Sequence, residues 1–204
     1  MILESWISAF LAIFAILNPI GLIPLFMEIV EGLDRKDRIR VFNVTVLTGF
    51  VTMTTMTFTG KWILANVFRI DIQEFRIAGG LLLTILAVRY IIFPEKEKVE
   101  NTLEGDPASK ALELSVVPMA VPLLVGPGSI VTGILVLDQN SALVTLLALI
   151  AGFAVCWGLF QLTPVIGRLM GKIGRLVIGR VLWIFIAAIG VHLLVTGIRA
   201  ILGG

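Results

Sequence analysis

The sequence predicts an all-α membrane protein with six transmembrane helices in a 3+3 inverted repeat, whose first and fourth spans are discontinuous. Three observations predict this fold class. The 204 residues are 58% hydrophobic and only 15% charged, which leaves too few charges to cover a soluble domain of this size. The apolar residues gather in runs long enough to cross a bilayer. Two of these runs contain prolines and glycines at corresponding positions.

Each expected span is an apolar run of about 18 residues or more with few charges. The runs fall at residues 5–29, 39–60, 75–93, 114–137, 141–163 and 181–201. They divide the chain into a first repeat at 1–93, a polar linker at 94–113 and a second repeat at 114–204. Little sequence lies outside these runs, so we expect no separate soluble domain.

The two repeats match each other in chain order. Asn18–Gly21 aligns with Gly126–Ser129 at an offset of 108 residues, and Gly49-Phe50 aligns with Gly152-Phe153. Residues of the third and sixth spans also match, at an offset of 110. Because each repeat holds an odd number of spans, the second enters the membrane from the opposite face, which makes the repeat inverted.

The distribution of Lys and Arg predicts the orientation. Twelve of the sixteen fall in or beside the first loop, the 94–113 linker and a loop expected at 164–180 between the fifth and sixth spans. The other four lie on the side that both termini share. Since basic residues are concentrated on the cytoplasmic side, we expect a multi-pass cell-membrane protein. Its N and C termini should lie outside, and its 94–113 linker should be cytoplasmic.

The interruptions in the first and fourth spans predict a binding site. Pro19 and Pro24 lack N–H donors and clash with the preceding turn, while Gly21 removes the steric limit on φ. A free N–H or C=O group costs several kcal/mol in hydrocarbon, so a broken helix needs protein or a polar cavity beside it. Paired breaks in an inverted repeat point to a midplane site. There, helix N-termini offer donors to an anion, and free carbonyls accept an ammonium.

A substrate with a carboxylate and an ammonium on one carbon fits such a pair of breaks. The expected substrate-binding residues are Asn18, Pro19, Ile20, Gly21, Val125, Gly126, Pro127, Gly128 and Ser129. The alternative is that both breaks are ordinary proline kinks, which are frequent in membrane helices. Kinks at equivalent positions of two repeats favour the site.

Two further features allow both a functional and a structural interpretation. Threonines recur along 39–60 at spacings of three and four, on one helical face, so Thr45, Thr48 and Thr52 form a possible cavity wall. The same hydroxyls could instead hold neighbouring helices together. His192 is the single histidine and a possible proton site. A neutral histidine bonded to a carbonyl is the structural alternative.

The sequence also argues against several classes of function. No Asp or Glu falls within the core of any expected span, and one histidine cannot build a metal or acid–base cluster, so we expect no enzyme, metal or cofactor. The basic residues form no patch suited to nucleic acid. The expected partners are the lipid bilayer and a small solute.

Three segments of the chain resemble the signature blocks of the MarC family of six-span membrane proteins: NPIGLIP, FRIAGGLLL and PMAVPLLVGPGSI. The family includes the small neutral amino acid transporters called SnatA, and the resemblance covers nearly the whole chain. It implies transport of glycine, alanine and similar amino acids by alternating access, linked to protons or Na+. The symmetrical breaks favour such a carrier, in which one half of the chain rocks against the other. A channel or exporter for another small solute, or a non-transporting membrane scaffold, are the alternatives.

Overall fold

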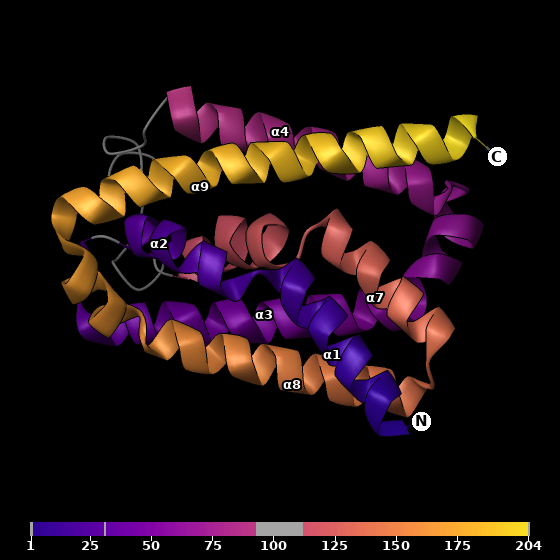
Figure 1. Cartoon of the computed structure of the whole chain (residues 1–204), viewed down its shortest axis with the longest axis horizontal. Coiled ribbons are helices and arrows are strands. Elements are labelled where there is room, and N and C mark those ends of the chain that lie inside the picture. Colours follow the sequence, from indigo (N-terminus) through magenta and orange to yellow (C-terminus); the bar gives the residue numbers. More distant parts are fainter. Residues whose placement is uncertain (1, 31, 93–111, 204) are drawn as a thin grey trace.

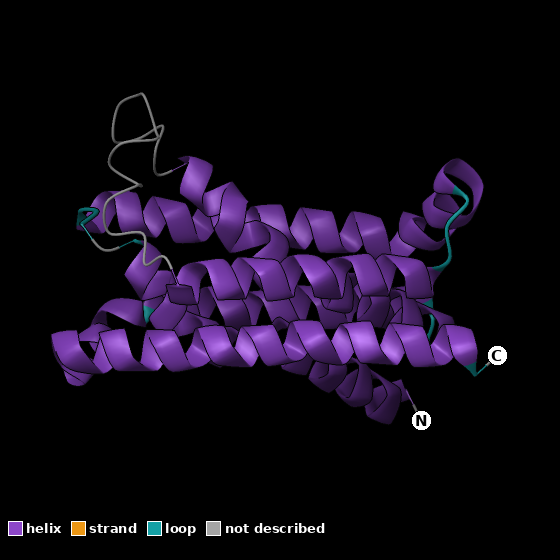
Figure 2. Cartoon of the chain, turned by 90° about the horizontal axis from the view of Figure 1, so that it is seen from above, coloured by secondary structure: helices purple, strands orange, loops and turns teal. Residues whose placement is uncertain are grey.

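The computed structural model describes residues 2–30, 32–92 and 112–203, and in these segments the chain forms helices joined by short connections, without any strand. Long helices lie roughly side by side in two perpendicular views (Figure 1, Figure 2). The elements are α1 (Ile2–Leu17), α2 (Pro19–Ile29), α3 (Arg35–Trp62), η1 (Ile63–Phe68), α4 (Ile72–Ile92), η2 (Ser115–Leu124), α7 (Pro127–Gln139), α8 (Ala142–Gln161) and α9 (Thr163–Leu202). This confirms the all-α fold class.

Four helical segments are long and apolar enough to cross a membrane: Leu3–Met27, Arg35–Phe68, Ala142–Gln161 and Arg180–Leu202. The bent pair Leu112–Leu124 and Pro127–Gln139 makes a fifth if it is counted as one span. α4 is not among these candidates. It has 21 residues, with Glu74 in its first turn and Arg89 in its last. Four or five spans are therefore supported by length and composition, and the sixth stays a prediction.

Two of the expected connections contain helical backbone. Residues 164–180 were expected to form a loop, but their backbone continues as the N-terminal part of the 40-residue α9. The sequence explains this, because Ile166, Leu169, Ile173 and Leu176 recur every three or four residues, which is a helical period. Most of the expected 94–113 linker lies outside the described residues, and its end at 112–113 is already helical.

The helix ends carry the side chains that such ends require. Asp34 caps α3 by accepting a hydrogen bond from the Asp37 N–H at 2.7 Å, and Ser141 caps α8 through the Val144 N–H at 3.3 Å. Before α4, the Glu74 carboxylate accepts from the Asp71 N–H at 2.6 Å. These caps satisfy backbone donors that would otherwise lack partners at the start of each helix.

Helices from the two halves of the chain interlock. α1 packs against α8 and α7, α3 packs against α7, η2 and α8, and α4 packs along α9. Aromatic rings join the halves in the core, where Phe160 of α8 lies with its centroid 5.0 Å from Phe26 and 5.9 Å from Phe42. The most extensive of these helix contacts, α4 with α9 and α1 with α8, join one helix from each half.

α4 and α9 cross in backbone contact at Gly80 and Gly190. A Cβ on Gly80 would lie 2.5 Å from the Gly190 carbonyl oxygen, and one on Gly190 would lie 2.7 Å from that of Gly80. Only glycine allows this approach, which is typical of small residues at membrane helix interfaces. α4 and α9 thus form a closely packed pair above the other helices in Figure 1.

Candidate functional site

The first span breaks at one residue, Asn18, which has a left-handed φ of 43°. Asparagine tolerates this region better than most residues. Its N–H donates to the Phe14 carbonyl and its carbonyl accepts from the Leu22 N–H, both at 3.1 Å, so hydrogen bonding continues across the break. Pro19 is the first residue of α2, where a missing N–H does no harm.

Gly21 makes room for the Asn18 side chain. A Cβ on Gly21 would lie 2.8 Å from the Asn18 Oδ1 and 2.9 Å from its Cγ. Such distances are too short for a real Cβ, so any larger residue at position 21 displaces the amide. The Asn-Pro-x-Gly sequence is therefore explained locally: Asn18 supplies the turn and the amide, and Gly21 leaves the amide its place.

The second break extends over two residues. Val125 (φ −120°, ψ 91°) and Gly126 (φ −103°, ψ −178°) are extended, and Pro127 is the first residue of α7. The helical segments on either side are bent by 58°. The buried Ser129 hydroxyl donates to the Leu124 carbonyl at 3.4 Å, which gives a partner to a carbonyl at the interrupted end. The first N–H groups of α7 have no carbonyl one turn back to accept them.

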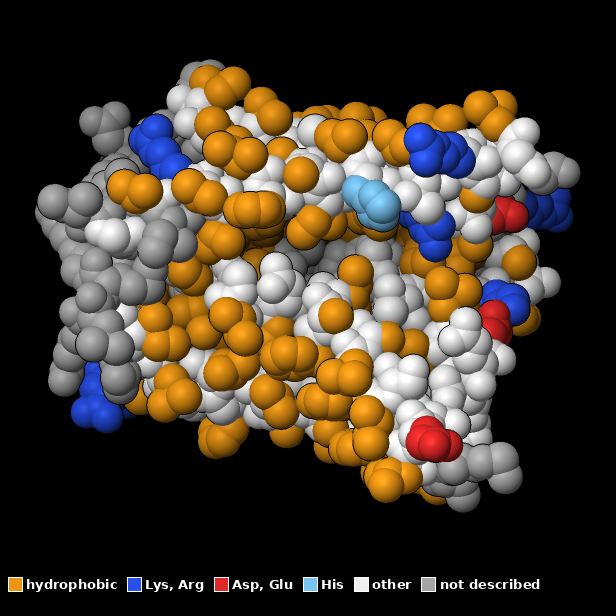
Figure 3. Space-filling view, in the orientation of Figure 1, with side chains coloured by type: hydrophobic (Ala, Val, Ile, Leu, Met, Phe, Trp, Pro, Cys, Tyr) orange, Lys and Arg blue, Asp and Glu red, His pale blue; other side chains and the backbone are white. Residues whose placement is uncertain are grey.

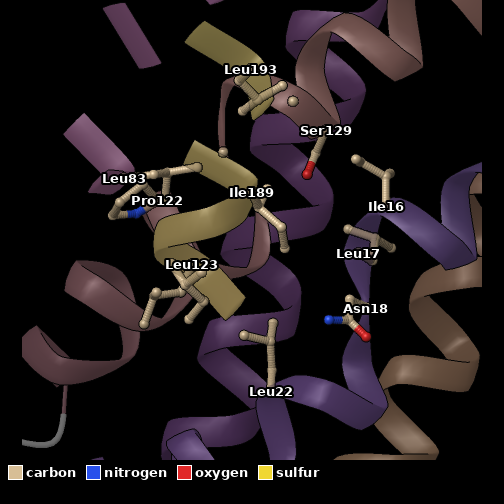
Figure 4. A pocket seen from close by; sticks show the side chains of 13 residues that line it. Ile16, Leu17, Asn18, Leu22, Leu83, Pro122, Leu123, Ser129, Ile189 and Leu193 are labelled. Carbon is tan, nitrogen blue, oxygen red and sulfur yellow. The ribbon is translucent and has the colours of Figure 1, made fainter. Parts of the chain in front are cut away.

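Both breaks line one cavity. Figure 4 shows the side chains of Asn18 and Ser129 in the same space, with Ile189 and Leu193 of α9 beside them. The lining residues are Ile16, Leu17, Asn18, Leu22, Leu83, Pro122, Leu123, Gly126, Gly128, Ser129, Ile186, Ile189 and Leu193. The cavity among them is small, about 60 Å³, well below the range of about 300–1,000 Å³ typical of sites for drug-sized ligands.

The cavity is apolar except for a few groups at the breaks. None of its described lining residues is charged. Its polar groups are the Asn18 amide, the Ser129 hydroxyl and the backbone from Gly126 to Ser129. A space-filling view shows a recess in the surface below the α9 ribbon of Figure 1 (Figure 3). The cavity can form hydrogen bonds and presents the positive N-terminal end of a helix, while its other walls are apolar. This combination suits a small ligand without net charge.

The structure brings together four of the nine expected binding residues, namely Asn18, Gly126, Gly128 and Ser129. The other five do not line the cavity. Pro19 is buried, Ile20 is exposed and Gly21 lies beneath the Asn18 amide. Val125 is fully buried and packs towards Gly49, while the Pro127 ring packs so closely on Gly79 of α4 that a Cβ there would overlap it. Which of the nine residues bind a substrate stays a prediction.

The three threonines expected as a cavity wall do not line this cavity. Thr45 is fully buried, and its hydroxyl donates to the Ser115 carbonyl at 3.1 Å. This bond joins α3 to η2. Thr48 and Thr52 are half-buried on the same helix.

His192 is exposed on α9 and does not line the cavity, although the next residue, Leu193, does. It is the pale-blue side chain at the surface in Figure 3. The Thr196 hydroxyl donates to the His192 carbonyl at 2.7 Å and lies 3.5 Å from the ring Nε2. Within the described segments no group of three or more His, Cys, Asp and Glu is placed to hold a metal.

Sequence reasoning missed the apolar walls of the cavity. Leu83 of α4 and Ile186, Ile189 and Leu193 of α9 complete it opposite the two breaks. No local signal could have identified these residues, because they are ordinary apolar residues within unbroken helices. Their role depends on how α4 and α9 pack against the rest of the chain.

Comparison with known proteins places nearly all of this chain in one group. Residues 3–202 match the family described as MarC family integral membrane protein. The UPF0056 membrane protein YhcE of Escherichia coli (strain K12) is 33% identical over 199 residues, covering 96% of this chain and 92% of the relative. A UPF0056 membrane protein of Methanocaldococcus jannaschii is 31% identical over 207 residues, covering 99% and 100%. These names state no substrate, and no solved structure matches the chain significantly.

Proposed function

The chain belongs to the MarC family of integral membrane proteins, and we propose that it is a secondary transporter of small neutral amino acids, glycine and alanine, working by alternating access. One observation carries the proposal. Two helix breaks about a hundred residues apart in the sequence line a single uncharged cavity. Discontinuous helices that meet in this way are the usual construction of a transporter's substrate site.

The cavity offers a partner for each end of a zwitterion. The substrate carboxylate is expected at the start of α7, where the N–H groups of Gly128 and Ser129 and the Ser129 hydroxyl can donate and the helix dipole is positive. The ammonium is expected near the Asn18 Oδ1, which can accept a hydrogen bond. A zwitterion has no net charge, which fits the lack of charged side chains among the described lining residues.

We further propose six spans in a 3+3 inverted repeat, with α4 as the third span. The packing supports this arrangement. The first span (α1 and α2) packs against the fifth (α8), and the equivalent pair, the fourth span (η2 and α7) and the second (α3), pack against each other as well. The side chains of Leu124 and Val125 pack against Gly49, and those of Ile13 and Leu17 pack against its equivalent, Gly152. Val125 and Leu17 occupy matching positions in the two repeats, at the offset of 108 residues.

The packing also suggests which part moves. Because the halves interlock, rocking one whole half against the other would break the contacts of α1 with α8 and of α3 with η2. The cavity instead lies between the closely packed α4–α9 pair and the remaining helices. We propose that access alternates by movement of the α4–α9 pair against the others.

Orientation and coupling belong to the same proposal. Both described chain ends lie at one end of the molecule (Figure 1, Figure 2), and the distribution of basic residues supports an outside position for that end. A cysteine at position 2 should then react with an impermeant thiol reagent on intact cells, whereas one at position 109 should not. The native Cys156 is buried and gives little background. Labelling at 109 alone would reverse the orientation.

Counterflow in proteoliposomes tests the transport itself. Vesicles loaded with unlabelled glycine should accumulate radiolabelled glycine and alanine with saturable kinetics, and imposed proton or Na+ gradients would show the coupling. A channel for another solute predicts conductance without counterflow, and a scaffold predicts neither. If no small neutral amino acid exchanges or binds, the transporter proposal is wrong.

A further inference from the structure

We infer that Lys36, Arg40 and Asn43, near the start of α3, bind the phosphate of an anionic phospholipid on the lipid-facing surface of the chain. None of these three residues lines the cavity between the breaks. The inference therefore goes beyond the proposed transport and does not rest on it. It needs only that the chain is an integral membrane protein.

Asn43 is a polar, exposed residue within the candidate span Arg35–Phe68. Its Oδ1 accepts hydrogen bonds from the Trp157 Nε1 and the Gln161 Nε2 of α8, both at 2.9 Å. Because an indole N–H can only donate, the oxygen of the amide must face Trp157. The amide nitrogen then faces away from it, and its two N–H groups have no acceptor among the described residues. They are available to an acceptor from outside the chain.

Asn43 shares its helix face with two basic residues. Lys36, Arg40 and Asn43 are all exposed and follow one another at spacings of four and three, so they lie within about 60° of each other around the α3 axis. Asp37 lies about 100° round the axis from Lys36, and the Asp34 carboxylate caps the helix. In the described part of the chain neither acid forms an ion pair with Lys36 or Arg40. Their positive charges are therefore not neutralised by the protein.

α8 indicates the depth of this cluster in the membrane. It has 20 residues and is about 30 Å long, which matches the thickness of the hydrocarbon core. Its last residue, Gln161, is bonded to Asn43, so Asn43 lies near one boundary of the hydrocarbon. α3 begins at Arg35 and extends past that boundary by about 12 Å. Lys36 and Arg40 are consequently at the level of the lipid headgroups.

The surface on the other side of Asn43 suits acyl chains. Leu47 and Val51 continue the exposed face of Asn43 along α3, and Ile150 continues the exposed face of Trp157 along α8. The two helices pack against each other and run side by side in Figure 1. A lipid can therefore lie with its chains along this apolar surface and its phosphate at the polar end.

The charges select the headgroup. A planar guanidinium such as that of Arg40 donates two hydrogen bonds to phosphate oxygens, and a lysine adds a second positive charge. The Asn43 amide can donate to a remaining oxygen. An anionic phospholipid keeps its net negative charge beside these groups, whereas the choline of phosphatidylcholine cancels it. We therefore expect a preference for phosphatidylglycerol over phosphatidylcholine.

The test measures lipid binding to the full-length protein in detergent by native mass spectrometry. The probes are phosphatidylglycerol and phosphatidylcholine with the same acyl chains, and the wild type should bind phosphatidylglycerol more tightly. Arg40→Gln should weaken phosphatidylglycerol binding roughly tenfold or more, because a charged hydrogen bond to phosphate is lost. Arg35→Gln is the matched control, since it removes the same charge from the same helix end about 140° away from Arg40. It should keep the wild-type preference.

A second substitution tests the amide. Asn43→Leu removes the two N–H donors and should weaken phosphatidylglycerol several-fold. Asn66→Leu is its control, because Asn66 is also exposed but donates to the Trp62 carbonyl of its own helical segment, at 3.0 Å. If Arg40→Gln fails to fold, Lys36→Gln takes its place and should also lower the preference for phosphatidylglycerol.

Three outcomes would overturn the inference. The first is equal binding of the two lipids by the wild type. The second is an equal loss of phosphatidylglycerol binding in Arg35→Gln and Arg40→Gln, which would indicate attraction by surface charge alone. The third is displacement of the lipid by glycerol 3-phosphate at a similar concentration, which would make the site one for a soluble phosphate. Amino acid transport is not involved in any of them, so the proposed function stands or falls separately.

Discussion

The two helix breaks are built from similar residues and yet differ in form. At the first, the single left-handed residue Asn18 keeps its backbone hydrogen bonds to Phe14 and Leu22, and Leu3–Met27 remains one candidate span. At the second, Val125 and Gly126 are extended and the helical segments meet at 58°. Proline and glycine therefore mark where a membrane helix is interrupted, but they do not set the size of the interruption.

The residues that precede the prolines differ in conformation between the two breaks. A residue before proline is driven from the helical to the extended region. Val117 and Val121, before Pro118 and Pro122, are extended, and so η2 is already irregular before Gly126 is reached. Ile23, before Pro24, stays within α2. The first break thus lies between two helices, α1 and α2, while the second follows an irregular one.

The two breaks consequently contribute different groups to the cavity. The first supplies a side-chain amide, because the backbone of Asn18 is already bonded. The second supplies backbone N–H groups, because those at the start of α7 have no acceptor within the helix, and the Ser129 hydroxyl lies beside them. Substitutions at the two breaks should therefore affect binding and stability in different ways.

The largest expected difference is between leucine at Gly126 and leucine at Gly21. A Cβ on Gly126 would lie 2.8 Å from the Pro122 carbonyl oxygen, a backbone atom, so Gly126→Leu should abolish glycine binding and also lower the free energy of unfolding by about 1–3 kcal/mol. At Gly21 the three atoms nearest to an added Cβ all belong to the Asn18 side chain, so Gly21→Leu should abolish binding with a smaller loss of stability. Calorimetry and thermal unfolding in detergent measure the two effects, with Gly158→Leu as control. If both variants bind glycine normally, neither break forms part of the binding site.

Removing the amide should cost less. Asn18→Ala is expected to weaken glycine binding by about 1–3 kcal/mol, because the ammonium loses a hydrogen-bond acceptor in a largely apolar cavity. Calorimetry gives the affinity. Asn18→Asp helps to separate this from backbone effects, since aspartate also tolerates the left-handed region and keeps an acceptor. If Asn18→Ala binds glycine like the wild type, the first break contributes shape alone.

The Ser129 hydroxyl should contribute less than the Asn18 amide. Its bond to the Leu124 carbonyl is long at 3.4 Å, and the backbone N–H groups beside it remain after Ser129→Ala. We expect a loss of about 0.5–1.5 kcal/mol in glycine affinity, within the usual contribution of one hydrogen bond. A larger loss than in Asn18→Ala would reverse the comparison and make the hydroxyl the main anchor at the second break.

The smallest effect is expected at His192. It is exposed, lies outside the cavity and is joined to Thr196 along its own helix. His192→Gln should keep glycine uptake and its response to an imposed proton gradient, as measured in proteoliposomes. A variant that still binds glycine but ignores the gradient would identify His192 as the proton carrier.

The sequence by itself determined the all-α membrane class, the positions of the two breaks and four of the residues that line the cavity. These features are local, since apolar run length fixes a span and clustered proline and glycine favour an interruption within it. The connection expected at 164–180 lies outside the candidate span Arg180–Leu202, but its backbone is helical and continuous with that span, which its helical period explains.

Only the tertiary structure decided which side chains close the cavity. Leu193 lines it because Gly80 and Gly190 bring α4 and α9 into backbone contact, and Thr45 faces Ser115 because α3 packs on η2. Each of these relations joins residues at least 70 positions apart. In lipid, apolar side chains gain little from facing protein rather than acyl chains, so apolar sequence alone does not indicate which face packs inward. Close packing between particular helices makes that choice.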